Sequence, residues 1–174
     1  MKNSARIIVW IVFIFGGALA GIFLDLKLFS EIFKNLIWHI ISFFIGVLLL
    51  RIVIIISKNT GRTLAKYGRE GNIPRMETNK LVKEGVYSCM RHPMHLGLML
   101  FPVSFAFLLG SVSFILIIAP LEILLMVIMI IFIEEPEAIK KFGEEYLEYK
   151  REVPFFNFKR DCLRLLFKKV KPKE

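Results

Sequence analysis

Long uninterrupted runs of apolar side chains constrain this chain more than any other feature of its sequence. Residues 7–24 carry no charge over 18 positions, and residues 37–57 carry one charge over 21 positions. A third run, residues 112–133, has 22 positions and contains Pro120 and Glu122. A helix needs about 20 mostly apolar residues to cross a bilayer. The sequence therefore predicts an integral membrane protein and excludes a disulfide-rich secreted module and most classes of soluble enzyme.

A shorter apolar run, residues 96–109, lies before the third long run and is separated from it by a Gly-Ser pair. Extended backward through Pro93, this run can form a helical hairpin with its neighbour over residues 93–133, with the Gly-Ser pair as a tight turn. We therefore predict an all-α bundle of four transmembrane helices. Proline lacks an N–H and clashes with the preceding helical turn. We thus expect Pro120 to kink or break the fourth helix, and a fifth membrane segment could start there or in the tail.

Basic residues are distributed unevenly around these runs. Of 24 lysines and arginines, Lys27 and Lys34 occupy the connection 25–35, and 21 lie before residue 7, between residues 58 and 91, or after residue 134. Such residues are enriched on the cytoplasmic side of a membrane protein, so we place both termini there, including the basic residues Lys2 and Arg6. The net charge of +9 then reflects membrane topology, and the absence of a basic, aromatic-rich module argues against nucleic acid binding.

This topology suggests one membrane domain, residues 1–174, with two parts. Residues 7–57 form an amino-terminal transmembrane hairpin, and residues 58–174 form a region that contains the second hairpin. Cys89 and Cys162 form no CxxC pair and give no metal signature. Because both fall on the predicted cytoplasmic side, where thiols stay reduced, we expect both cysteines to be free.

Some small or polar residues interrupt the apolar runs. Gly17 and Gly21 form a GxxxG motif, which lets two helices approach closely, either within the bundle or between two copies. His39, near the start of a helix, is best explained by a hydrogen bond to a neighbouring carbonyl. A charge at Glu122 is costly in lipid, so this residue must face a cavity or a partner, or stay protonated; an ion pair with Arg51 is one hypothesis.

Charged residues gather at both ends of the second hairpin. Residues 85–87 (Gly-Val-Tyr) and 91–95 (Arg-His-Pro-Met-His) precede it, and the proline suits the first turn of a helix, whose free N–H groups attract anions. Glu134 and Glu135 follow it, and Pro136 either closes the fourth helix or starts a new one. An antiparallel hairpin brings the glutamates beside the arginine and the first histidine. Such a cluster can hold a charged ligand, and a plain ion-pair cluster at the membrane surface is the alternative.

The segment after the glutamates is amphipathic. Phe142, Tyr146 and Tyr149 fall at i, i+4 and i+7, which predicts one apolar face of a surface helix within residues 140–155. Beyond Pro154, phenylalanines and leucines mix with basic residues, which indicates a tail that lies on an anionic leaflet.

Taken in order, these motifs resemble the isoprenylcysteine carboxyl methyltransferase family of integral membrane enzymes. The resemblance rests on Gly-Val-Tyr at 85–87, Arg-His-Pro at 91–93, the glutamate pair, Phe-Gly-Glu-Glu-Tyr at 142–146 and Val-Pro at 153–154. More loosely, the chain is similar to the membrane methyltransferases that include the phospholipid N-methyltransferases. The resemblance implies S-adenosylmethionine as the methyl donor and S-adenosylhomocysteine as the product. It places the cofactor on the cytoplasmic side, between the loop before the third helix and the segment after the fourth.

The resemblance also implies site residues, and no metal. Implied cofactor contacts are Asn79, Lys80, Leu81, Val82, Tyr87, His92, Pro93, Met94, His95 and Glu134. Implied catalytic residues are Arg91, His92 and Glu135, with Arg91 orienting the acceptor. Two positions depart from the family pattern: an arginine one turn before the glutamate pair is Ile130 here, and a tyrosine after Arg-His-Pro-x is His95.

The leading functional hypothesis is methylation of a lipid-modified or lipid-like acceptor that enters from the bilayer, first of all the carboxylate of a prenylated cysteine. A carboxylate is already ionised near pH 7, whereas the amine of a phospholipid, the alternative acceptor, must lose a proton. A membrane reductase that uses NADPH and a small non-enzymatic membrane scaffold are the remaining alternatives.

Overall fold

The computed structural model describes residues 3–73 and 77–170, and within residues 3–7 it describes the helical backbone alone. The predicted cytoplasmic position of Lys2 lies outside the described residues, as does the side chain of Arg6. In these ranges every regular element is a helix, which confirms the predicted all-α class. The chain divides into two compact units. We call Met1–Arg51 with Met99–Val127 the amino-terminal unit, and Ile52–Leu98 with Ile128–Glu174 the carboxyl-terminal unit.

Three helices in the described part of the chain are long and apolar enough to cross a membrane. They are Ile8–Leu28, Leu36–Tyr67 and Phe114–Phe142. The remaining predicted crossing, the third in chain order, corresponds to a shorter apolar helical stretch, Pro93–Leu109. The long spans match the predicted apolar runs, and a fourth crossing stays a prediction.

Pro120 does not break the third long helix. A π-helical turn, η2 (Phe114–Ile118), comes directly before α6 (Ala119–Met129), and a second one, η3 (Ile130–Glu134), comes directly before α7 (Glu135–Phe142). Pro120 and Pro136 therefore each follow a wide turn, in which the carbonyl that a proline ring would meet is displaced. The helix continues to Phe142, so no further membrane segment starts at Pro120, and Pro136 lies in the first turn of α7.

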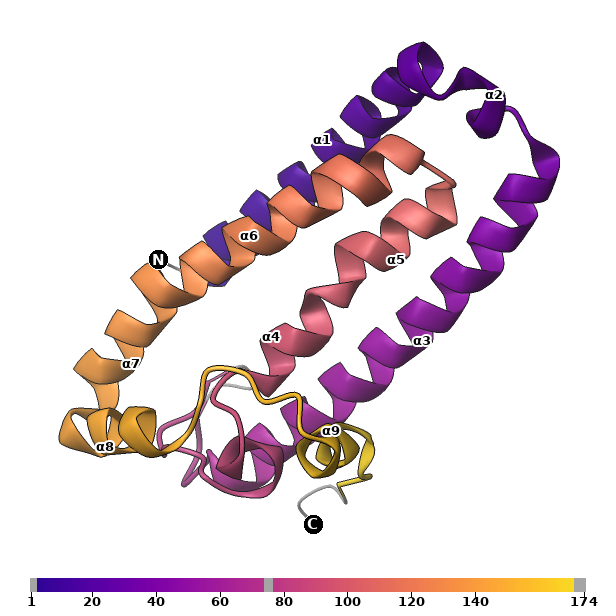
Figure 1. The fold of residues 1–174 in the computed structure, drawn as a ribbon. Helices are drawn as coiled ribbons and strands as arrows, with labels where there is room; N and C mark the ends of the chain where they lie inside the picture. Colours follow the sequence, from indigo (N-terminus) through magenta and orange to yellow (C-terminus); the bar gives the residue numbers. More distant parts are fainter. Residues whose placement is uncertain (1–2, 74–76, 171–174) are drawn as a thin grey trace. The chain divides into compact units, whose positions relative to one another are not determined.

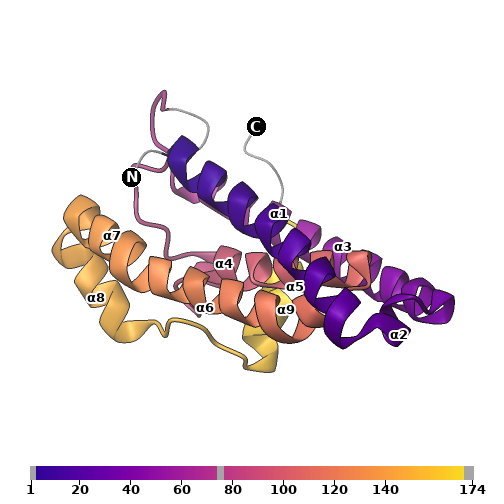
Figure 2. The same ribbon diagram turned by 90° about the horizontal axis from the view of Figure 1, so that it is seen from above.

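The amino-terminal unit contains α1 (Asn3–Leu28), α2 (Ser30–Phe33), the first part of α3 (Leu36–Tyr67), α5 (Leu100–Leu109), η2 and most of α6. In this unit α1 packs against η2 and α5 (Figures 1 and 2). A Cβ atom at Gly17 would lie 2.8 Å from the Ile118 side chain, and one at Gly21 would lie 3.0 Å from Phe114. The GxxxG motif therefore packs within the chain, the first of the two predicted uses.

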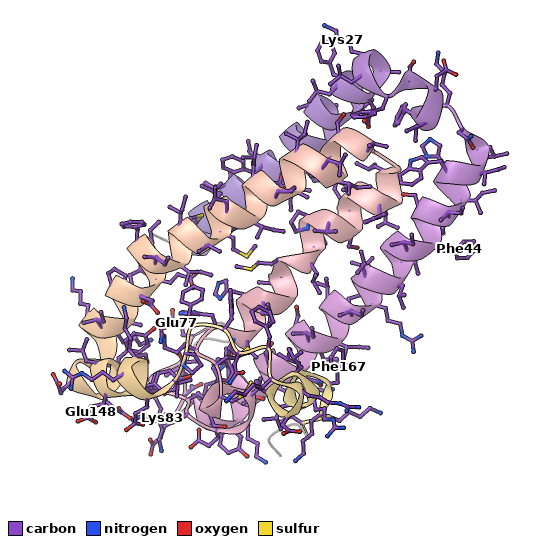
Figure 3. The ribbon with its side chains drawn as sticks, in the orientation of Figure 1. Lys27, Phe44, Glu77, Lys83, Glu148 and Phe167 are labelled. Carbon is purple, nitrogen blue, oxygen red and sulfur yellow. A yellow bond between two sulfur atoms is a disulfide. The ribbon has the colours of Figure 1, made fainter. Side chains whose placement is uncertain are left out.

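Polar side chains of this unit bind mainly to the backbone. The indole of Trp38 donates to the carbonyl of Gly110 at 2.7 Å, where the backbone turns with φ +66°, as the predicted tight turn requires. His39 Nε2 lies 2.5 Å from the Phe33 carbonyl, which confirms the expected role of this histidine. The outer surface is apolar, as the projecting side chain of Phe44 shows (Figure 3). Such a surface suits contact with lipid.

The carboxyl-terminal unit contains the end of α3, η1 (Gly85–Ser88), α4 (Pro93–Leu98), η3, α7, α8 (Glu144–Glu152) and α9 (Arg160–Phe167). Nitrogen and oxygen atoms of side chains are concentrated around α8 and α9 (Figure 3). The predicted single helix within residues 140–155 is wrong in one respect. Gly143, at φ +59°, ends α7 in a conformation that favours glycine, and α8 then packs beside α7.

A disulfide joins Cys89 to Cys162, with Cα atoms 6.0 Å apart. The prediction that both cysteines are free is therefore wrong. Their sequence separation of 73 gave no sign that the two cysteines lie close together, because this proximity arises only when α9 packs back against η1. Asn59 supports this packing from α3 by donating to the Leu166 carbonyl at 2.9 Å.

Candidate active site

A cavity of about 240 Å³ lies within the carboxyl-terminal unit. Its wall is formed by the end of α3, the segment 78–82, the residues that lead into α4, and the helices α7 and α8. The sequence motifs before and after the second hairpin thus meet in one place. This is the arrangement that the antiparallel hairpin predicted.

Most of the residues implied by the resemblance line this cavity. They are Lys80, Leu81, Val82, Tyr87, Arg91, His92, Met94, His95 and Glu134. Asn79 does not, because its side-chain amide closes a loop by exchanging hydrogen bonds of 2.9 and 2.7 Å with the backbone of Glu70. Pro93 is fully buried at the start of α4, and Glu135 is not one of the residues that line the cavity.

The wall also includes residues that the sequence did not assign to it. They are Leu64, Thr78, Ala138, Phe142, Tyr146 and Tyr149. The aromatic residues were interpreted as the apolar face of a surface helix, and this face lies against the cavity. Ala138 follows Glu134 by one turn of helix, a spacing that could have indicated it. No sequence signal marked Leu64 or Thr78.

Glu135 is the centre of a buried ion-pair cluster. Its carboxylate accepts hydrogen bonds from Arg91 Nε at 3.1 Å and Nη2 at 2.9 Å, and from Lys150 Nζ at 2.6 Å. His92 Nε2 lies 3.2 Å from the same carboxylate. Because Glu135 is only 3% exposed, its charge must be compensated by such partners. Its place in the fold is to hold α7 against α8 and the start of α4.

Arg91 uses its remaining donor group on the backbone. Nη1 donates to the carbonyls of Val153 at 2.5 Å and Lys150 at 3.1 Å. The backbone N–H groups of Arg91 and His92 donate to Pro154 and Phe155 at 3.0 and 3.3 Å. All three guanidinium nitrogens of Arg91 therefore have partners. These bonds hold the segment after α8 against the entry to α4.

Burial shifts the pKa values of several titratable groups that line the cavity. Burial lowers the pKa of His92 to about 4, so its ring is a neutral imidazole near pH 7. Burial raises the pKa of Tyr146 to about 12, and it raises the pKa of Tyr149 as well. These phenols are therefore neutral hydrogen-bond donors, and the Tyr149 hydroxyl donates to the Tyr87 carbonyl at 2.6 Å.

His95 and Glu134 form a more exposed pair at the cavity, with Nε2 and the carboxylate 3.1 Å apart. Among the described residues, His92, His95 and Glu134 also bring one potential metal-donor atom each within 4.8 Å of one another. Together with the aromatic wall and Lys80, the cavity offers an anion, cations, neutral donors and flat apolar surfaces. Such a set suits a ligand that carries charges of both signs and an aromatic ring.

The family comparison agrees with this geometry. The sequence model of the family described as phospholipid methyltransferase matches residues 41–145, more than half of the 174 residues. The matched region contains every residue of the cavity wall except Tyr146 and Tyr149. No curated protein and no solved structure matches the chain.

The match confirms the looser of the two predicted relations, and the isoprenylcysteine resemblance stays a prediction. Three apolar helices of membrane-spanning length agree with a multi-pass integral membrane protein. The chain belongs to the phospholipid methyltransferase family and is a membrane methyltransferase.

Proposed function

We propose that this cavity binds S-adenosylmethionine and that the protein transfers its methyl group to a lipid-like acceptor. When bound, this cofactor supplies a methyl group activated by a sulfonium centre. The observation that carries the proposal is the meeting of Glu134, His95 and the aromatic wall in one cavity of the matched region. The residues fit the cofactor, because it carries an ammonium, a carboxylate, ribose hydroxyls and an adenine ring.

The roles of the chain's residues follow from their chemistry. The carboxylate of Glu134 would accept hydrogen bonds from the ammonium or the ribose hydroxyls. Lys80 would meet the cofactor carboxylate, and the rings of Phe142 and Tyr146 would flank the adenine. Glu135 and Arg91 are positioning residues in this proposal, because their polar atoms bind each other and the backbone. Alignment of two reactants can supply roughly 7–11 kcal/mol of a barrier.

Two acceptors are consistent with the site. The ordered motifs favour the carboxylate of a prenylated cysteine, which needs no base, and the low pKa of His92, about 4, agrees because it makes this ring a weak base. The family match favours the amine of a phospholipid. For an amine, His95 with its partner Glu134 is the candidate for removing the proton.

The concentration of basic residues supports a cytoplasmic position for the site and both termini. An amphiphilic acceptor would then reach the cavity from the bilayer rather than from solution.

The proposal is tested by calorimetric titration of the full chain in detergent with S-adenosylmethionine, S-adenosylhomocysteine and NADPH. Glu134→Gln should weaken binding of both S-adenosyl ligands by tenfold or more, because it removes the anion from the cavity. Glu137→Gln is the matched control, since Glu137 follows Glu134 in the same continuous helix, Phe114–Phe142, and does not line the cavity. If folded protein binds neither S-adenosyl ligand, the proposal fails, and binding of NADPH alone would point to the reductase alternative.

A further inference from the structure

A second cavity, of about 270 Å³, lies within the amino-terminal unit. It is lined by α1 on one side and by η2 and α6 on the other. Because both walls belong to helices long and apolar enough to cross a membrane, we call it the intramembrane cavity. It shares no lining residue with the cavity of the candidate active site, so it is a separate site.

Glu122 is the one lining residue of this cavity, in the described part of the chain, whose side chain is polar. Both of its carboxyl oxygens are buried without a hydrogen-bond partner among the described residues. A Cβ atom at Gly17, another lining residue, would lie 2.7 Å from Oε1, so the carboxyl group lies at the cavity wall. A buried polar group without a partner costs free energy, and an ionisable residue inside a membrane segment typically marks a functional site.

Open space adjoins this carboxyl group. A Cβ atom at Gly16, which also lines the cavity, would meet no other atom within 4 Å. Gly17, the next residue, is closely packed. Rotation about the side-chain bonds of Glu122 turns its carboxyl group from Gly17 toward the space at Gly16. A ligand in that space can therefore supply the missing hydrogen-bond partner.

The cavity opens onto the apolar outer surface of the unit. Two of its lining residues, Leu121 and Phe13, are 59% and 44% exposed. In a membrane such a surface faces lipid chains, so a ligand reaches the cavity from the bilayer. The ligand is thus a molecule with a long apolar part and one polar group.

The wall favours an uncharged polar group. A cation would form a buried ion pair with Glu122, and such a pair repays its desolvation only when further hydrogen bonds support it. No second polar side chain lines the cavity in the described part of the chain. A protonated carboxyl group offers one donor and free acceptor capacity, and a hydroxyl group offers the same set. The two groups can therefore satisfy each other.

We propose that the intramembrane cavity binds the hydroxyl group of an uncharged lipid alcohol through Glu122. The apolar chain of the ligand lies along α1 and α6. This inference goes beyond methyl transfer and does not rest on the proposed cofactor site.

The test is photolabelling of the full chain in nanodiscs of phosphatidylcholine, a lipid without a free hydroxyl group. The labelling probe is dodecanol with a diazirine on its chain, and mass spectrometry locates the labelled residues. Unlabelled competitors are dodecanol, dodecane and dodecylammonium, which share one chain length and differ in the polar group.

Three variants accompany the unaltered chain, each shown to be folded by its melting temperature. Glu122→Leu removes the polar group. Gly16→Leu fills the cavity, and it leaves Glu122 in place and has room for its side chain. Leu19→Phe is the control, because Leu19 is an exposed residue of α1 that does not line the cavity.

We expect saturable labelling of the lining residues, with dodecanol competing at concentrations tenfold or more below those of dodecane and dodecylammonium. In Glu122→Leu the advantage of dodecanol over dodecane should disappear. In Gly16→Leu saturable labelling should be lost, and Leu19→Phe should behave as the unaltered chain does.

Equal competition by dodecane and dodecanol in the unaltered chain would overturn the inference, as would stronger competition by dodecylammonium or an absence of saturable labelling. If Gly16→Leu instead abolishes self-association measured by cross-linking, the cavity is a contact between two copies and the inference also fails. Titration of the unaltered chain with S-adenosylhomocysteine reports on the proposed function separately, so either proposal can fail without the other.

Discussion

Two buried glutamates, one in each unit, have opposite surroundings. Glu122 in the amino-terminal unit and Glu135 in the carboxyl-terminal unit are each 3% exposed. Glu135 accepts hydrogen bonds from Arg91 and Lys150 and lies beside His92. Both oxygens of Glu122 are buried without a hydrogen-bond partner in the described part of the chain.

The difference separates a carboxyl group that joins segments of the fold from one that is buried without a hydrogen-bond partner among the described residues. Glu122 packs so closely on α1 that a Cβ atom at Gly17 would lie 2.7 Å from its Oε1 atom. The hypothesis that it pairs with Arg51 is not supported, because no ion pair joins these two described residues and Arg51 is exposed. Glu135, in contrast, joins three segments of the candidate site. We therefore expect mutation of Glu135 to lower stability strongly and mutation of Glu122 to change it little, although the two residues are equally buried.

The largest effect is expected for Glu135→Ala. It leaves the buried guanidinium of Arg91 without its carboxylate, and breaking a buried pair costs about 3–5 kcal/mol. Thermal unfolding in detergent measures the loss, and cofactor binding should fall with it. Glu145→Ala, which removes an exposed partner of Lys83, is the control and should change stability by about 0–1 kcal/mol. Equal stability of the two variants would show that the ion-pair cluster around Glu135 does not stabilise the fold.

A smaller loss is expected for Cys89→Ser under oxidising conditions. Removing a disulfide typically costs about 2–4 kcal/mol, because the unfolded chain gains freedom. Equilibrium unfolding with and without reductant measures the effect. In the presence of reductant, the unaltered chain and the variant should have the same stability, as they would in a reducing cytoplasm. A stability difference that persists after full reduction would show that the thiol contributes through packing instead.

The next effect concerns pH and His92. Because its pKa is about 4 in the fold and 6.5 in a free side chain, the unfolded chain takes up the proton first as the pH falls. His92 therefore contributes stability that is complete above pH 6.5 and is lost as the pH falls toward 4, roughly 3 kcal/mol in all. Unfolding curves of the unaltered chain and His92→Gln should converge over this interval. Parallel curves would mean that His92 is protonated inside the fold.

The smallest effect is expected for Glu122→Gln. Because the carboxyl group has no hydrogen-bond partner among the described residues, its replacement by an amide should change the free energy of unfolding by less than about 1 kcal/mol in either direction. Melting temperature in detergent provides the measurement, with Glu135→Gln as the matched substitution. A loss for Glu122→Gln as large as that for Glu135→Gln would show that a partner of Glu122 exists in the membrane.

Much of the site could be inferred from the sequence because its motifs are local. Arg91, His92 and Pro93 stand next to one another at a helix start, and the glutamate pair stands at the end of the same hairpin. Antiparallel helices then leave little choice about which ends meet. The wall contributed by Leu64 and Thr78 could not be inferred, because α3 and the segment 78–82 approach the hairpin only through tertiary packing.

The sequence by itself determined the membrane class, the apolar spans, the turn at Gly110 and the motif set of the candidate site, since these depend on hydrophobicity and short-range geometry. Only the tertiary structure decided that Cys89 meets Cys162, that helix continues past Pro120, and that Glu122 has no hydrogen-bond partner among the described residues while Glu135 has several. The physical reason is that the disulfide and the hydrogen bonds depend on which side chains distant in sequence are brought together, and a residue's neighbours along the chain do not contain that information. The helix continues past Pro120 because of the wide turn η2 that precedes it.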